Sequence, residues 1–199
     1  IAAKYLAPKQ VRRIGIVGTG TQARLQLTHL DSVISCKDTI VFGRDDAKLE
    51  QYKNEMVHQG FVVSTTKDIN ELTSQCNLIV TTTTSTQPLI SWKHVQKGTH
   101  ITAVGSDTPS KQELDQVILG EADLVVADSI SQCLERGEIF HAFQKGIVRQ
   151  GDIVELGKVI AGKIEGRTSE DQITIADLTG VAVQDIQISK AVYEGTNEN

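Results

Sequence analysis

Short apolar runs alternate with helix-like patterns along most of the chain, and this alternation constrains the fold more than any other feature. Six runs have the length and composition of strands: residues 13–17, 39–42, 61–64, 78–81, 100–104 and 124–127. The runs at 78–81 and 124–127 carry no polar alternation, which is typical of strands buried on both faces of a parallel sheet. The segments between the early runs have apolar residues at helical spacing. The sequence therefore predicts an α/β fold, a doubly wound and mainly parallel sheet with helices on both faces.

The last quarter of the chain shows a looser pattern. From about Gly151 we expect one helix over residues 153–164, a further strand over 173–176 and a closing helix over 183–193. The sequence shows no internal repeat, no Pro/Ser-rich linker and no low-complexity tract that would mark a boundary. These patterns indicate one domain.

The composition excludes several classes of protein. The 199 residues carry a formal net charge of −5 and no basic run, which argues against a nucleic-acid partner. The sequence shows neither a signal-peptide pattern nor an apolar stretch long enough for a membrane span, so we expect no membrane association. Cys36, Cys76 and Cys133 match no zinc or disulfide spacing, and the five histidines form no ligand pair. We therefore expect free thiols, no metal site and a cytoplasmic location.

A glycine-rich turn follows the first strand. The sequence "GTGTQA" has a GxGxxA pattern, with a buried-type strand before it and an amphipathic helix after it. In dinucleotide-binding turns the first glycine permits the tight turn and the second lets the backbone approach a pyrophosphate, while the last small residue keeps the helix close to the strand. The amides and the dipole of the helix N-terminus attract phosphates. We expect Gly18, Gly20, Thr21, Gln22 and Ala23 to bind a dinucleotide; the alternative is a glycine corner in a non-binding α/β protein.

The end of the second strand indicates which nucleotide would bind. An NAD site usually has Asp or Glu there, which accepts a hydrogen bond from the ribose 2′-hydroxyl. Here the strand ends in "IVFGRDD", so Gly43 and Arg44 take that place. Arg44 could pair with a 2′-phosphate in a bidentate manner, which favours NADP(H). NAD(H) stays possible because Asp45 could reach the ribose, although Asp45 and Asp46 could equally cap the next helix.

A run of threonines, "TTTTSTQP", follows the fourth strand. The carboxyl ends of strands line the ligand crevice of a doubly wound sheet. Small hydroxyl side chains there could touch a cofactor without crowding it, so we expect Thr82, Thr83 and Thr84 to take part in cofactor binding. The alternative is a strand end followed by ordinary turn residues.

Five stretches together resemble one known family. They are "IGIVGTGTQA", "TTTTSTQPLI", "HITAVGSDTPSKQELD", "ADLVVADS" and "DLTGVAVQD", in the order and at the spacing of the ornithine cyclodeaminase/mu-crystallin family. The resemblance implies a Rossmann-type NAD(P)-binding domain over residues 1–199. It also implies that residues 181–199 form a C-terminal helix that leads back to a separate substrate and dimerisation domain, built mainly from an N-terminal part that is absent here.

The resemblance also assigns roles to single residues. Asp107 matches the family aspartate that acts as general acid/base in cyclodeaminases. Val104 and Gly105 come just before it and are expected to contact the cofactor. Gly180 and Val181, in "TGVAVQD", are placed near the nicotinamide. The mu-crystallin branch tends to lack the aspartate, so its presence favours an active enzyme.

Physical reasoning on Asp107 leaves an alternative open. Its carboxylate lies on a "GSDTP" turn after a buried-type strand, where it could relay a proton to or from an amine or imine. The alternative is an Asx-turn or a helix N-cap ahead of "SKQELD". Glu113 and Asp115, in that stretch, are expected on a solvated helix face. Asp128 is expected to cap the helix after the strand at 124–127.

The resemblance implies an NAD(P)-dependent oxidoreductase or deaminase that acts at the C–N bond of a small amino or imino acid. Three reactions fit: cyclodeamination of ornithine to proline, reduction of a cyclic ketimine such as a pyrroline carboxylate, and alanine-dehydrogenase-like deamination. Cyclodeamination usually suits NAD, whereas Arg44 favours net reduction, and these two types rank close together. The alternatives are a non-catalytic NADPH-dependent binding protein of the crystallin type and a regulatory NAD(P)-sensing domain. We expect the full-length protein to be a homodimer and residues 1–199 alone to be inactive.

Overall fold

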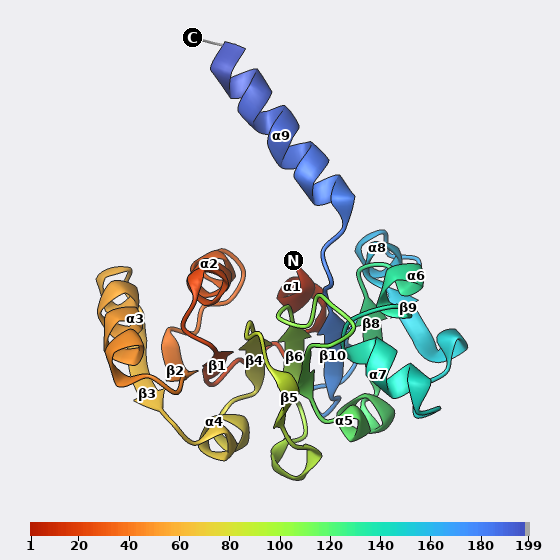
Figure 1. Ribbon diagram of the computed structural model, residues 1–199, viewed down its shortest axis with the longest axis horizontal. Coiled ribbons are helices and arrows are strands. Elements are labelled where there is room, and N and C mark those ends of the chain that lie inside the picture. The colour runs from red at the N-terminus through yellow and green to blue at the C-terminus, as the bar shows by residue number, and fades with distance from the viewer. Residues whose placement is uncertain (198–199) are drawn as a thin grey trace.

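The computed structural model describes residues 1–197, apart from the side chains of residues 182–185 and 196–197. Its centre is an eight-stranded sheet in which neighbouring strands run parallel (Figure 1). The strands are β1 (Ile14–Val17), β2 (Asp38–Phe42), β3 (Val62–Thr66), β4 (Leu78–Thr81), β6 (His100–Ala103), β8 (Leu124–Ala127), β9 (Ile153–Glu155) and β10 (Thr174–Asp177). Their order across the sheet is β3-β2-β1-β4-β6-β10-β8-β9, which confirms the predicted fold class.

Helices cover both faces of this sheet (Figure 1). They are α1 (Ala2–Leu6), α2 (Thr21–Leu30), α3 (Asp46–His58), α4 (Ile69–Gln75), α5 (Gln116–Glu121), α6 (Ile130–Cys133), α7 (Glu138–Gln144) and α8 (Leu156–Ile160), with 3-10 turns at Trp92–His94 and Gln150–Asp152. A further helix, α9 (Ala182–Asn197), does not cover the sheet. On one face, Ile16 of β1 packs in a cluster with Leu27 of α2 and Tyr52 of α3. On the other face, Ile79 of β4 packs in a cluster with Leu72 of α4. Two apolar layers therefore enclose the sheet, as its unbroken apolar strands require.

Two features of the fold differ from the expectation drawn from the sequence. The helix expected over residues 153–164 is wrong, because residues 153–155 form β9, which pairs with β8, and the helix covers only Leu156–Ile160. A second sheet of two parallel strands, β5 (Thr86–Ile90) and β7 (Gln112–Leu114), has no counterpart among the expected strands. Pairing between distant segments decides both features, and the periodicity of a short window carries no information about such pairing.

The strand order changes direction beside β1. From β1 the chain moves outward through β2 to β3, and then it crosses back to β4 on the other side of β1. In an open parallel sheet, the carboxyl ends of the strands at such a switch point border a crevice where ligands bind. The loops after β1, β2 and β4 are therefore expected to border a ligand site.

The last helix, α9, extends away from the sheet (Figure 1). Its side chains Ile186 and Ile188 are each 63% exposed. Within the part of the chain that the structure describes, we find no helix with the length and apolar character needed to cross a membrane.

Candidate cofactor site and the pocket beside it

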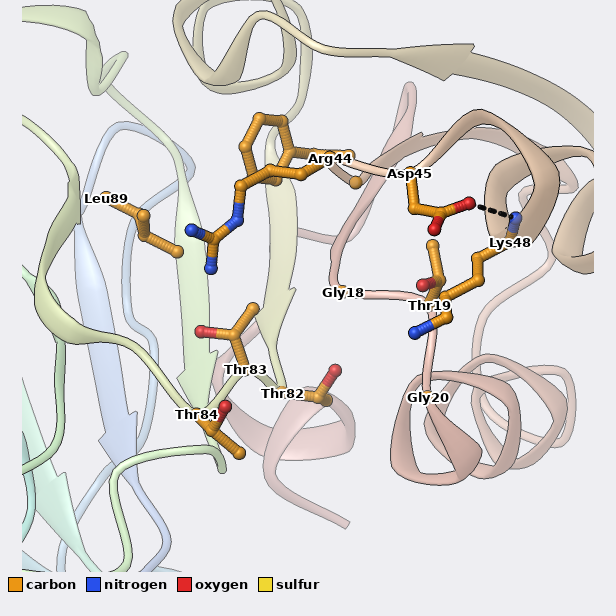
Figure 2. A pocket seen from close by; sticks show the side chains of 12 residues that line it. Gly18, Thr19, Gly20, Arg44, Asp45, Lys48, Thr82, Thr83, Thr84 and Leu89 are labelled. Atoms are coloured by element: carbon orange, nitrogen blue, oxygen red, sulfur yellow. Dashed lines mark hydrogen bonds between the residues drawn. The ribbon is translucent and has the colours of Figure 1, made fainter.

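A pocket of about 320 Å³ lies at the carboxyl ends of β1, β2 and β4 (Figure 2). The glycine turn, the end of the second strand and the threonine run, which are separate in sequence, all contribute to it. Its lining consists of Gly18, Thr19, Gly20, Phe42, Gly43, Arg44, Asp45, Lys48, Thr82, Thr83, Thr84 and Leu89. The structure therefore brings together six of the residues expected to bind a cofactor.

The two glycines of the turn are needed for different reasons. Gly18 has a φ of +115°, and a Cβ there would lie 2.8 Å from the Thr82 hydroxyl oxygen. Gly20 has a φ of −81°, and a Cβ there would meet no described atom within 4 Å. Neither backbone conformation nor packing within the protein therefore requires a glycine at position 20. The free space beside Gly20 fits the close approach of a pyrophosphate to the backbone.

The start of α2 is suited to an anion. Gly20 is the N-cap residue, and no described side chain caps the helix there, so the first amides have no side-chain acceptor. Such amides, together with the helix dipole, favour phosphate. Ala23 is fully buried, and its carbonyl oxygen accepts a hydrogen bond of 3.1 Å from the Tyr52 hydroxyl. Ala23 thus acts by packing α2 closely against the strand and α3.

Two cations face this pocket. The Arg44 guanidinium points toward Thr83 and Leu89, and the Lys48 ammonium points toward Gly20 (Figure 2). Among the described residues, no hydrogen bond or ion pair engages either charged group. Lys48 is absent from the expected site, because it lies in the first turn of α3 and the orientation of that helix comes from packing. The two charges make the pocket suitable for a phosphorylated ligand.

Asp45 caps a helix, which is one of the two roles expected for it from the sequence. Its carboxylate accepts a hydrogen bond of 3.0 Å from the Lys48 amide, so Asp45 is the N-cap of α3 (Figure 2). This backbone hydrogen bond lowers the pKa of the Asp45 carboxyl group. One carboxylate oxygen therefore caps the helix, while Asp45 also lines the pocket, so its contact with a ribose stays a prediction.

A second pocket, of about 290 Å³, lies on the other side of the start of α2. It is lined by Gln22, Gln26, Val104, Asp107, Leu178, Thr179 and Gly180. The Asp107 side chain is 52% exposed, and its carboxylate forms an ion pair of 2.6 Å with the Lys111 ammonium. A carboxylate in this position could exchange a proton with a ligand in the pocket.

The helix that we expect after Asp107 does not form there. Residues 112–114 are β7, so the helix N-cap alternative for Asp107 is wrong. Glu113 is 0% exposed rather than on a solvated helix face. Asp115 caps α5 instead, because its carboxylate accepts a hydrogen bond of 3.1 Å from the Val117 amide. Side-chain polarity suggested exposure, but the burial of Glu113 depends on donors that come from other parts of the fold.

The buried Glu113 side chain lies beside the loops after β4 and β6. Its carboxylate accepts hydrogen bonds from the Thr81 hydroxyl at 2.7 Å, the Thr83 amide at 2.6 Å and the Gly105 amide at 3.0 Å. Burial raises the pKa of the Glu113 carboxyl group, and these hydrogen bonds act in the opposite direction. The carboxylate thus connects the loop after β4 with the loop after β6.

Two further buried acids support neighbouring segments. The Glu138 carboxylate accepts hydrogen bonds from the backbone amides of Glu113 at 2.7 Å and Leu114 at 3.1 Å. The Asp177 carboxylate accepts one of 2.8 Å from the Ile139 amide. Burial raises the pKa of Asp177 to about 8, and it raises the pKa of Glu138 well above its usual value. These two acids hold β7 and the start of α7 in place.

Asp128 holds the loop that borders the second pocket. Its carboxylate accepts hydrogen bonds of 2.8 Å from the Gly180 amide and 3.2 Å from the Thr179 hydroxyl. It also accepts one of 2.8 Å from the amide of Ser129, which is itself the N-cap of α6. The expectation that Asp128 caps the next helix is therefore wrong, because Ser129 is the N-cap of α6 and Asp128 instead holds the loop at residues 179–180.

The remaining expected residues lie near the pockets without lining them. Among the described residues, Thr21, Ala23, Gly105 and Val181 are outside both linings. The structure adds several lining residues that sequence reasoning missed: Thr19, Phe42, Lys48, Leu89, Gln26 and Leu178. Gln26 could have been predicted from the sequence, because it lies one helical turn after the expected site residue Gln22.

Comparison with known proteins places these features in a family. The model of the ornithine cyclodeaminase/mu-crystallin family matches residues 1–199. The alanine dehydrogenase of Archaeoglobus fulgidus is 40% identical over 195 residues, which are 98% of this chain and 60% of that relative. The structure of an archaeal alanine dehydrogenase dimer with bound NAD has a TM-score of 0.94 at 38% identity, covering 99% of this chain and 61% of that one.

A second solved structure is similar in shape. It is the Δ1-pyrroline-2-carboxylate reductase of Thermococcus litoralis in complex with NADH and L-proline, with a TM-score of 0.93 at 28% identity over 99% of this chain and 62% of that one. The chain therefore spans about 60% of the length of these relatives. The family model and the identity to the dehydrogenase agree: the chain belongs to the ornithine cyclodeaminase/mu-crystallin family.

Proposed function

We propose that this chain is the NAD(P)-binding part of an enzyme that oxidises or reduces the C–N bond of a small amino or imino acid. The observation that carries the proposal is the position of the two pockets on either side of the start of α2. One pocket has the glycine turn and two cations, and the other has the Asp107 carboxylate. A dinucleotide that follows the glycine turn would have its phosphates at α2 and its nicotinamide end toward the second pocket.

Asp107 is the residue that we assign to proton transfer. A bound nicotinamide would supply or accept the hydride at the carbon that carries nitrogen. In the direction of reduction, Asp107 would give a proton to the nitrogen, and in the direction of oxidation it would take one away. Lys111, at 2.6 Å, holds the carboxylate at the pocket without burying it.

The substrate class follows from chemistry and from the relatives together. Alanine dehydrogenase and Δ1-pyrroline-2-carboxylate reductase, by their names, act on a small amino acid and a small cyclic imino acid. The second pocket, at about 290 Å³, has room for a ligand of that size. We infer that a cyclic ketimine or a short α-imino acid is reduced here, with cyclodeamination as the close second candidate.

Arg44 is the residue that we assign to nucleotide choice, with NADP(H) preferred. Arg44→Ala is expected to weaken NADPH binding by roughly 10- to 100-fold, because a charge-assisted hydrogen bond contributes about 1.5–3 kcal/mol. NADH binding should change less than about twofold, since NADH has no 2′-phosphate for Arg44 to pair with. Titration of nucleotide fluorescence measures both. Arg149→Ala, which removes an exposed arginine paired with Asp152, is the control. Equal losses for both nucleotides would contradict the assignment.

The exposed part of α9 has a place in this proposal. We infer that Ile186 and Ile188 contact a further region of the kind that makes up the rest of the relatives' length. That region would complete the substrate site, and a homodimer would be the assembly. One structural neighbour is a dimer.

The proposed function can be tested with a longer protein that contains this chain together with the proposed substrate region. Oxidation of NADPH would be followed with Δ1-pyrroline-2-carboxylate and with pyruvate plus ammonia, and formation of proline from L-ornithine would be followed with NAD. We expect turnover with at least one of these substrates. Tight nucleotide binding without turnover on any of them would instead support a binding or sensing protein.

A further inference from the structure

One buried carboxylate contacts the loops on both sides of the site. The Glu113 oxygen Oε1 accepts the Thr83 amide, and Oε2 accepts both the Thr81 hydroxyl and the Gly105 amide. Thr83 lines the nucleotide pocket. Gly105 lies between Val104 and Asp107, which line the second pocket. A single side chain therefore bonds one lining residue of the nucleotide pocket and the residue that follows Val104, a lining residue of the second pocket.

The bonding pattern requires an acceptor on both oxygens of residue 113. Two of the three donors are backbone N–H groups, which cannot turn round to accept a hydrogen bond. No cation among the described residues pairs with Glu113, and burial, together with the negative charge of Glu113, raises the pKa of two acids, Glu138 and Asp177. Without these three hydrogen bonds, a buried anion in such surroundings would be strongly unfavourable. The donors on the two loops are therefore the reason that the carboxylate can be buried here.

The two loops also touch each other directly. A Cβ added at Gly105 would collide with the Thr83 carbonyl oxygen, and it would lie 2.6 Å from the Thr83 nitrogen and 2.5 Å from Glu113 Oε2. Close-packed backbone of this kind transmits a displacement from one loop to the other. Glu113 is bonded at this point of contact.

We propose that Glu113 is a positioning residue that aligns the nucleotide-binding threonine loop with the Asp107 turn. The inference rests on the proposed function for its consequence in turnover. The structural part of the proposal is that one carboxylate holds both loops, and this part depends only on the three hydrogen bonds. Glu138 acts one step further away, because it bonds the backbone of β7 and neither loop.

The test compares Glu113→Gln with Glu138→Gln in the enzyme that contains this chain. Glutamine has the same shape, but its NH2 group would face an N–H donor at position 113, so one loop loses its partner. In Glu113→Gln, we expect faster amide hydrogen exchange around Thr83 or around Gly105, in the loop that faces the NH2 group, and a smaller increase in the loop packed against it. In Glu138→Gln, the same change at a similarly buried acid, faster exchange is expected around Glu113 and Leu114 instead.

Nucleotide binding and kinetics supply the second measurement. For Glu113→Gln we expect about tenfold weaker binding of the reduced nucleotide, which corresponds to one charge-assisted hydrogen bond. We also expect kcat to fall, because the Asp107 turn moves as well. For Glu138→Gln, the nucleotide Kd should stay within about twofold of wild type. If Glu113 aligns the two loops, Glu113→Gln should raise the KM for nucleotide and lower kcat, whereas Glu138→Gln should do neither.

Other outcomes would overturn the proposal. Unchanged exchange in both loops with unchanged nucleotide affinity would show that Glu113 aligns neither pocket. Faster exchange over the whole chain, including β2 and α3, would show a general role in stability instead. If the wild-type protein binds nucleotide but turns over no substrate, the proposed function fails, whereas the exchange pattern still decides the role of Glu113.

Discussion

Replacement of Asp107 by Asn is expected to lower kcat by about 10²–10⁴-fold, the usual contribution of a positioned general acid or base. Asparagine keeps the size of the side chain and removes the group that gives or takes the proton. Asp107 lies in the second pocket and outside the lining of the nucleotide pocket. Nucleotide affinity should therefore remain within about twofold of wild type. Steady-state kinetics with the imino acid substrate and a nucleotide titration measure the two effects separately.

Asp115→Asn is the matched control for this experiment. It is the same substitution in the same segment of sequence, at a carboxylate that caps α5 with a bond of 3.1 Å to the Val117 amide. We expect a small loss of stability of about 1 kcal/mol or less, with unchanged kcat. Retention of most of the activity by Asp107→Asn would remove Asp107 from the reaction.

Gly105→Ala should have the largest effect on the structure of the site. The added methyl group would collide with the Thr83 carbonyl oxygen, which belongs to the backbone and cannot move without its loop. Overpacking together with a weakened bond to Glu113 should cost about 3 kcal/mol of unfolding free energy. For a chain of this size, that loss lowers Tm by about 10 °C. Because the displaced loop carries Thr82 to Thr84, nucleotide binding should fall as well.

Thermal unfolding and nucleotide titration of the same sample check this expectation. Gly151→Ala is the control, since a Cβ there would meet no described atom within 4 Å. A Gly105→Ala protein with wild-type Tm and wild-type nucleotide affinity would show that the two loops are not packed as described.

The sheet could be predicted because its strands carry their own signal. The apolar run at residues 78–81, for example, is visible in the sequence, and in the structure the same residues form a fully buried strand. The glycine turn was recognisable for a similar reason, since strand, glycines and helix are contiguous. By contrast, β9 and the β5–β7 pair depend on partners far away in sequence, so a local pattern could not reveal them.

The site was only partly accessible from sequence. Arg44 and the threonines follow strands, and strand ends meet at one edge of a parallel sheet, so their convergence could be expected. Lys48 lies in the first turn of a helix whose orientation depends on packing. Glu113 was misinterpreted because a glutamate in a polar segment is usually exposed. The Thr81 hydroxyl and the amides of Thr83 and Gly105 make its burial favourable.

The sequence by itself determined the α/β architecture and the glycine turn, because each depends on a local pattern. It also supplied two candidates, Arg44 from the end of a strand and Asp107 chiefly from the resemblance to a family. The tertiary structure decided that these candidates border two pockets beside α2, and that Glu113 joins the two loops. The physical reason is that a hydrogen bond to a buried charge needs donors from several segments at once. Their meeting is a property of the folded chain, and no single stretch of sequence contains it.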